Sequence, residues 1–140
     1  MGEAEVELFH RWSERLGAAS DPLDVWYEEV WAPDIDYRAI EGAPDDVGPI
    51  LGRDAMRAYL GEWYEMFPDL VTAPEEVIDA GPETVIVMWN VTGTAKLSGA
   101  MTELNFAQVC RIRDGQMVWG REYMTKEEAL AAVQSEGLAT

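Results

Sequence analysis

Two polar residues, Gln108 and Glu122, stand where the alternation of side chains predicts an apolar interior. They lie on two runs of period-two character that flank Asp114 and Gly115, a pair typical of a tight β-hairpin. A buried amide or carboxylate is costly without partners, so the two residues indicate a lined cavity rather than a solid core. A carboxylate in an apolar cavity has a raised pKa and exchanges protons near neutral pH. Glu122 is therefore the candidate acid-base group, and Gln108 is the candidate for orienting a substrate carbonyl or a water.

Both residues also have a purely structural interpretation. Glu122 would then pair with an Arg or accept a hydrogen bond from a buried Tyr or Trp, and Gln108 would satisfy a neighbouring polar group. Together they would form a buried network that stabilises the core without doing chemistry. The sequence leaves both interpretations open.

The elements that position these residues follow the order helices, strands, helix. This order predicts a single α+β domain over residues 1–140, a cone-shaped barrel whose helices pack in the concave face of a curved, mostly antiparallel sheet. Apolar spacing, caps and turn residues mark the boundaries. The predicted elements are a helix over 3–18, a helix from Pro22 that ends at Pro33, a strand over 34–40, a turn-rich loop over 41–49, a helix between Gly52 and Pro68, strands over 70–79, 84–97, 100–113 and 116–124, and a helix over 126–133 with Thr125 and Glu128 as a capping box.

Alternation along the last three strands predicts the side chains that face the concave side. On the final strand the predicted inner set is Val118, Gly120, Glu122 and Met124, with Met117 facing outward. Aromatic residues are numerous and would line a cavity suited to a flat, apolar ligand, although plain core packing is the default explanation for them. The candidate lining residues are Trp12, Trp26, Tyr27, Tyr37, Tyr59, Trp63, Trp89, Val91 and Phe106.

The outer face of the same strands also carries apolar residues. Ala107, Val109, Trp119 and Tyr123 fall on neighbouring strands and would form a contiguous patch. Such a patch on a monomer usually marks an interface. We therefore expect a homodimer through the outer face of the sheet; the alternative is a scattered set of amphipathic surface residues.

Charge and composition exclude several classes of partner. The net charge of −17, with only two lysines, disfavours binding to nucleic acid or to an anionic membrane surface. No apolar run approaches the length of a membrane span, and no signal peptide is visible. The lone His10 and Cys110 cannot form a His/Cys zinc site, so no metal or cofactor is expected. A single cysteine fits a reducing compartment, which favours the cytoplasm.

Four segments carry a family resemblance. The segments are residues 51–60 (LGRDAMRAYL), residues 77–81 (VIDAG), residues 106–118 (FAQVCRIRDGQMV) and residues 121–123 (REY). Together they resemble the SnoaL-like branch of the nuclear transport factor 2-like superfamily, which includes polyketide cyclases, ketosteroid isomerases and limonene epoxide hydrolases. The resemblance implies a cone-shaped barrel with an apolar pocket, often dimeric, but a shared fold does not supply a reaction.

The catalytic sets of these relatives transfer only in part. The general-base Asp of ketosteroid isomerases falls at Ala39, and their oxyanion-holding Asp falls at Gln108, which can donate but not titrate. The last-strand Asp of limonene epoxide hydrolases matches Glu122, while its partners fall at Trp89 and Val91. The resemblance therefore implies either proton-transfer chemistry of another kind on a small apolar, ring-bearing molecule (isomerase, cyclase, dehydratase or hydrolase), or a non-catalytic ligand-binding or assembly domain.

Overall fold

The computed structural model describes residues 3–44 and 46–135, and in this range the chain folds as helices, then strands, then a helix. Residues 1, 2, 45 and 136–140 of the predicted domain lie outside the described residues. The elements in chain order are α1 (Glu3–Ala18), α2 (Pro22–Val25), the π-helix η1 (Trp26–Val30), β1 (Trp31–Arg38), β2 (Ile50–Leu51), α3 (Arg53–Met66), β3 (Val71–Asp79), β4 (Thr84–Thr94), β5 (Met101–Arg113), β6 (Gln116–Tyr123) and α4 (Lys126–Ser135).

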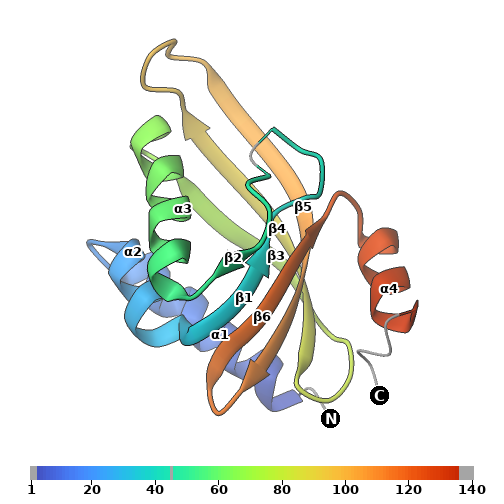
Figure 1. The fold of residues 1–140 in the computed structure, drawn as a ribbon. Helices are drawn as coiled ribbons and strands as arrows, with labels where there is room; N and C mark the ends of the chain where they lie inside the picture. The colour runs from blue at the N-terminus through green and yellow to red at the C-terminus, as the bar shows by residue number, and fades with distance from the viewer. Residues whose placement is uncertain (1–2, 45, 136–140) are drawn as a thin grey trace.

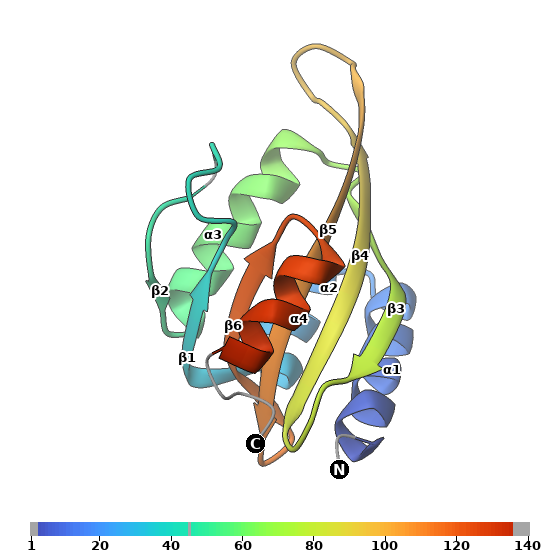
Figure 2. The same cartoon turned by 90° about the vertical axis from the view of Figure 1, so that its right-hand side faces the viewer.

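The six strands form one curved sheet in the order β2-β1-β6-β5-β4-β3. Strands β1 and β6 run parallel, and the other neighbours are antiparallel. Helices α1, α2 and α3 cover the concave face, whereas α4 lies on the convex face (Figures 1 and 2). The predicted α+β class and the mostly antiparallel, curved sheet are confirmed; the sheet stays unclosed, with β2 and β3 as its edges.

Local signals in the sequence explain several boundaries. The carboxylate of Asp21 accepts a hydrogen bond from the backbone N–H of Leu23 at 3.2 Å and caps α2. The hydroxyl of Thr125 accepts from the backbone N–H of Glu128 at 3.1 Å, which is half of the predicted capping box on α4. Asp114 and Gly115 adopt positive φ angles of 53° and 79° and close the β5–β6 hairpin, as the sequence indicates.

The second helix ends earlier than the sequence predicts. Its last turn is the π-helix Trp26–Val30, and β1 begins at Trp31, two residues before Pro33. Proline normally breaks a strand because it lacks a backbone N–H. Here the register of β1 on β6 is irregular between Trp31 and Asp36, so Pro33 lies where the ladder is already interrupted.

A bulge changes the phase of β6 near its start. Arg111 pairs with Trp119 and the next residue, Ile112, pairs with Met117, which leaves Val118 as the extra residue. Met117 is therefore fully buried in the concave core, and the prediction that it faces outward is wrong. Val118, which the alternation predicts on the inner face, is the partly exposed bulge residue and belongs to neither core cluster. Glu122 lies beyond the bulge, so its predicted phase is unaffected.

Helix α4 covers the apolar patch on the outer face. Ala107 and Val109 are fully buried and pack with Ala129 and Val133 of α4 in a second, smaller core. The sequence predicts these residues at an exposed interface, but α4 of the same chain covers them. The small side chains of α4 let the helix pack closely against the sheet. The homodimer stays a prediction, and Ala107 and Val109 are not available as its contact surface.

Candidate functional site

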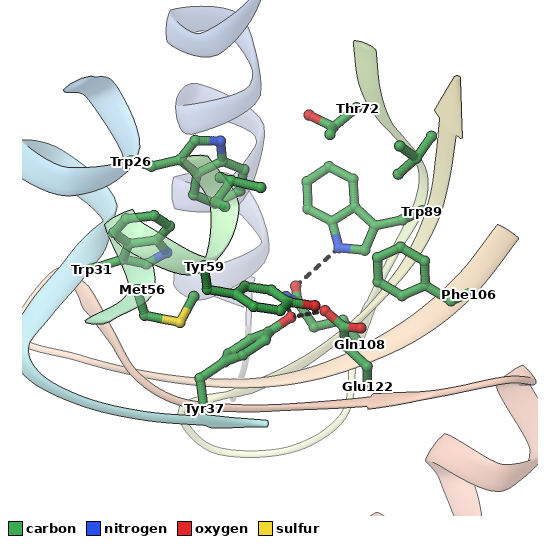
Figure 3. A pocket seen from close by; sticks show the side chains of 12 residues that line it. Trp26, Trp31, Tyr37, Met56, Tyr59, Thr72, Trp89, Phe106, Gln108 and Glu122 are labelled. Atoms are coloured by element: carbon green, nitrogen blue, oxygen red, sulfur yellow. Dashed lines mark hydrogen bonds between the residues drawn. The ribbon is translucent and has the colours of Figure 1, made fainter. Parts of the chain in front are cut away.

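Three neighbouring strands bring three polar side chains together beneath the helices. In the sheet register, Gln108 of β5 stands opposite Glu122 of β6, and Tyr37 of β1 stands beside Gly120 of β6. Tyr37 and Gln108 are 3% and 6% exposed, respectively. The two candidate residues of the sequence are thus adjacent, and a tyrosine from the first strand joins them (Figure 3).

Four side chains of this cluster form a chain of hydrogen bonds that ends on a carboxylate. The indole Nε1 of Trp89 donates to Oε1 of Gln108 at 3.0 Å. The amide Nε2 of Gln108 donates to the hydroxyl of Tyr37 at 2.7 Å, and that hydroxyl donates to Glu122. An indole N–H can only donate, so it determines which end of the amide faces Tyr37. The tyrosine proton is therefore directed to Glu122, which is the acceptor at the end of the chain.

Tyr37 stays protonated in this setting. Burial raises the pKa of Tyr37 well above its ordinary value, and the negative charge of Glu122 raises it further. The buried thiol of Cys110 lies 2.9 Å from Oε1 of Gln108, and burial raises its pKa as well. The cluster therefore combines one carboxylate with donors that keep their protons at neutral pH.

Gly120 makes room for the tyrosine ring. A Cβ atom on Gly120 would lie 2.5 Å from two ring carbons of Tyr37. Carbon atoms do not approach so closely, so the bare backbone of β6 at this position lets the ring lie against the strand. Alternation alone predicts Gly120 on the inner face, whereas the close approach that requires a glycine there arises only when β1 pairs with β6.

Two adjoining cavities open above this cluster. The inner one has a volume of about 80 Å³ and the outer one about 410 Å³. Residues that line both cavities are Tyr59, Leu60, Thr72, Val91, Phe106 and Glu122. Those that line only the inner cavity are Trp26, Trp31, Tyr37, Met56, Trp89 and Gln108. The shared lining joins the cavities into an inner and an outer chamber, with Glu122 at the boundary.

The loop that precedes β2 forms part of the outer chamber. Ala43 and Pro44 line it, next to Ile40. The carboxylate of Asp46 accepts from the guanidinium of Arg38 at 3.0 Å, and also from backbone N–H groups of the same loop. These bonds hold the pKa of Asp46 well below its usual range, the guanidinium having the largest effect. An ionised Asp46 thus holds the loop in its position at the chamber.

The predicted lining residues divide into three groups. Trp63 lines the outer chamber, Trp12 packs edge-on against Phe9 in the core, and Tyr27 lies outside both chambers, where its hydroxyl donates to Asp54. The other predicted residues line the inner chamber: Trp26, Tyr37, Tyr59, Trp89, Val91 and Phe106. The sequence did not single out Met56, Leu60 and Thr72 as lining residues.

Trp31, on the apolar stripe of the predicted second helix, is expected in the pocket wall or in the core beneath it, and it lines the inner chamber because the chain turns into β1 at that point. The residues that the sequence missed had only weak signals. Thr72 lies on an edge strand where alternation is poorly marked. Among the described residues, no three His, Cys, Asp or Glu side chains come together in a way that would hold a metal ion. None of the helices described is both long and apolar enough to cross a bilayer.

Comparison with solved structures gives several similar folds at low sequence identity. A candidate SnoaL-like polyketide cyclase from Jannaschia sp. CCS1 superposes with a TM-score of 0.68 at 23% identity, over 91% of this chain and 88% of that one. Rv0760c from Mycobacterium tuberculosis, solved with estradiol-17β-hemisuccinate, gives 0.67 at 16% identity, over 86% and 92%. AclR from Streptomyces galilaeus, a candidate hydroxylase, gives 0.65 at 17% identity, over 94% and 97%.

These structures share the fold with the chain, and at such identities the likeness does not extend to activity. No curated protein sequence matches the chain. The model of the SnoaL-like domain, in contrast, matches residues 9–119, a range that runs from α1 into β6 and includes Tyr37, Trp89 and Gln108. The chain is therefore a member of the SnoaL-like domain family of the nuclear transport factor 2-like superfamily.

Proposed function

We propose that the chain binds a flat, apolar, ring-bearing molecule in the joined chambers and transfers a proton at Glu122. One observation carries the proposal. The carboxylate of Glu122 lines a mostly apolar cavity of about 410 Å³ and is the final acceptor of the hydrogen-bond chain that runs from Gln108 through Tyr37. Ligand cavities typically combine an apolar lining with a few convergent polar groups. The volume is within the usual range for a small organic ligand.

The proposed chemistry is proton abstraction next to a ring carbonyl. Glu122 removes a proton from the carbon beside the carbonyl, and the C–H electron pair forms a C=C bond while the carbonyl pair moves onto oxygen. The hydroxyl of Tyr59, which lines both chambers with Glu122, is the proposed donor to this oxyanion. Where a second C=C bond lies next to the carbon that loses the proton, the enolate extends over it, and return of the proton by Glu122 to the far carbon moves the double bond and isomerises the molecule. Tyr37 holds the carboxylate in position, because its raised pKa keeps it a donor.

The similar structures support the size and shape of the ligand. Rv0760c accommodates a steroid ester in the same fold, and the Jannaschia protein is described as a candidate cyclase of polyketides. The chambers of this chain are lined by aromatic rings on several sides, which suits a flat molecule (Figure 3).

A non-catalytic binding role is the second candidate. Gln108 uses its oxygen to accept from Trp89 and Cys110 and its nitrogen to donate to Tyr37, so both ends of its amide are engaged by the protein. A network of this kind also stabilises a core with no chemistry. In that case Glu122 and Gln108 shape a binding cavity but do not react.

Hydrogen exchange of a bicyclic ketone separates the two candidates. We would measure exchange of the α-protons of 2-tetralone into D₂O by NMR, and its binding by calorimetry, for the wild type and for Glu122→Gln. The proposal predicts that Glu122→Gln slows exchange by roughly 100-fold or more while binding persists. Trp119→Phe, on the convex face, is the matched control and should exchange at the wild-type rate. Binding without catalysed exchange in the wild type would instead establish the binding role.

A further inference from the structure

Aromatic residues make up half of the lining of the inner chamber. Six of the twelve residues that line it are aromatic, and they come from η1, β1, α3, β4 and β5. They are Trp26, Trp31, Tyr37, Tyr59, Trp89 and Phe106. Figure 3 shows Trp26 and Trp31 on one side, Trp89 and Phe106 on the other, and Tyr37, Gln108 and Glu122 at the floor. Rings from five elements thus surround one small space.

Three of these rings form a continuous wall. Trp26 and Trp31 stack with their centroids 5.8 Å apart, and Trp26 lies 5.9 Å from Trp89 in a tilted arrangement. The electron-rich faces of aromatic rings attract cations, and tryptophan does so most strongly. A wall of this composition is more than an apolar surface, because it favours positive charge over a neutral group of the same shape.

The charge inside the chambers has one sign. Among the described residues that line either chamber, Glu122 is acidic and none is a Lys, Arg or His. The negative charge of Glu122 acts on Tyr37, because it contributes to the raised pKa of that tyrosine. An anionic ligand would therefore be repelled without compensation from a nearby cation, whereas a cationic ligand would gain both the carboxylate and the rings.

We propose that the inner chamber is an aromatic cage for an organic cation, so that the ligand of this protein carries a compact tertiary or quaternary ammonium group joined to a ring. The small volume of about 80 Å³ suits the ammonium head, and the outer chamber of about 410 Å³ accommodates the ring. The inference rests on the proposed function only in using the same cavity.

Alkylation of the nitrogen sets how many hydrogen bonds the ammonium head needs. A primary ammonium group needs three hydrogen-bond acceptors to replace its water. In the inner chamber the amide oxygen of Gln108 already accepts from Trp89 and Cys110. A quaternary ammonium needs no hydrogen bonds and is attracted to ring faces, so the structure favours it over a primary amine.

Calorimetric titration with three phenols of one shape tests the inference. The probes are 4-(trimethylammoniomethyl)phenol, its neutral isostere 4-neopentylphenol and the anion 4-(sulfomethyl)phenol. The cage predicts that the cation binds about ten- to thirtyfold more tightly than the neutral isostere, and that the anion binds more weakly than both. The titrations are repeated at high salt, because attraction to the net charge of −17 is screened there whereas contact with the cage is not.

Two variants assign the preference to the chamber. Glu122→Gln and Tyr59→Leu should each reduce the cation-to-neutral ratio while 4-neopentylphenol still binds. Trp119→Leu removes an aromatic residue from the convex face and should leave the ratio unchanged. Thermal unfolding of each variant verifies that it is folded.

The outcomes separate this inference from the proposed function. A cation preference that survives high salt and falls in both variants supports the cage. Equal or tighter binding of the neutral isostere overturns the cage and leaves the proposed ring-binding function standing. If none of the three phenols binds the folded wild type, the cage and the proposed ligand cavity are both overturned.

Discussion

The concave face of the sheet is covered by α1, α2 and α3 and carries large aromatic rings, whereas the convex face is covered by α4 (Figure 2). Smaller side chains fill the convex face where α4 packs, and Trp119 and Tyr123 are only partly buried beside them. On the convex side Ala107, Val109, Ala129 and Val133 pack into a filled contact. On the concave side Trp26, Trp31 and Trp89 meet at centroid distances near 6 Å and leave the two chambers.

This difference shows how one sheet supports both a core and a site. Small side chains let a short helix approach closely, so that the convex face excludes solvent and polar groups. Bulky rings hold the helices away from the concave face, and the remaining space ends on the hydrogen-bonded carboxylate of Glu122. The same apolar alternation therefore produces a filled interface on one face and a lined cavity on the other.

Gly120→Ala should give the largest effect on the concave face. The new methyl group would meet the ring of Tyr37 at 2.5 Å, so the ring must move and its bonds to Gln108 and Glu122 must break. We expect a loss of about 3 kcal/mol in the free energy of unfolding, measured by urea denaturation. Gly17→Ala is the control, since nothing lies within 4 Å of its Cβ position. Equal stability of the two alanine variants would contradict the proposed packing.

Val133→Asp tests the convex face. Val133 is 3% exposed and packs in the α4 core, so a carboxylate there should release α4 at a cost of about 2 kcal/mol. Ala107 and Val109 would then be uncovered, and the variant should self-associate in sedimentation experiments. Ligand affinity at the concave face should stay within the error of the wild type. A loss of ligand binding in the folded variant would show that the two faces are not independent.

Tyr37→Phe removes the donor to Glu122 and keeps the ring. Burial and the charge of Glu122 raise the pKa of Tyr37 in the folded state above the ordinary value of about 10. The unfolded chain therefore loses this proton first, so the stability is complete below about pH 10 and falls as the pH rises further. Urea denaturation as a function of pH should show a steeper alkaline loss for the wild type than for Tyr37→Phe. Parallel curves would exclude a buried, protonated Tyr37.

Asp46→Asn should have the smallest effect. The pKa of Asp46 is lowered in the folded state, chiefly by Arg38, so its contribution is present above the ordinary Asp pKa of about 4 and is lost as the pH falls below it. The asparagine variant should resemble the acidified wild type, with slightly weaker ligand binding and little change in unfolding temperature. Because Ala43 and Pro44 line only the outer chamber, the cation-to-neutral ratio should not change.

The sequence predicts the concave site better than the convex face. Alternation places Gln108 and Glu122 on one face, and the hairpin at Asp114 and Gly115 puts them on neighbouring strands. The sequence allows for a buried Tyr that donates to Glu122, but it does not identify Tyr37 as that donor, because the link depends on the parallel pairing of β1 with β6, a contact between residues 85 positions apart.

Two further features escaped prediction for physical reasons. The bulge at Val118 turns Met117 inward, and period-two alternation contains no signal for an inserted residue. The alternation correctly predicts Ala107 and Val109 on the outer face, but the element that packs on them is α4. The apolar face of α4 consists of small residues, so its sequence does not indicate which side of the helix faces the sheet. An apolar face of a sheet can be covered by a helix of the same chain or by a second protein chain, and the count of apolar residues on that face does not distinguish the two.

A crystal structure of the wild-type protein soaked with 2-naphthol would test the central claim most directly. The account predicts density for the ring system in the joined chambers, near Phe106 and Tyr59, with the naphthol oxygen within hydrogen-bonding distance of Glu122. Helices α1 and α3 should keep their positions. Chambers filled by collapsed aromatic side chains, with naphthol bound elsewhere or not at all, would contradict the claim that the concave face holds a ligand site.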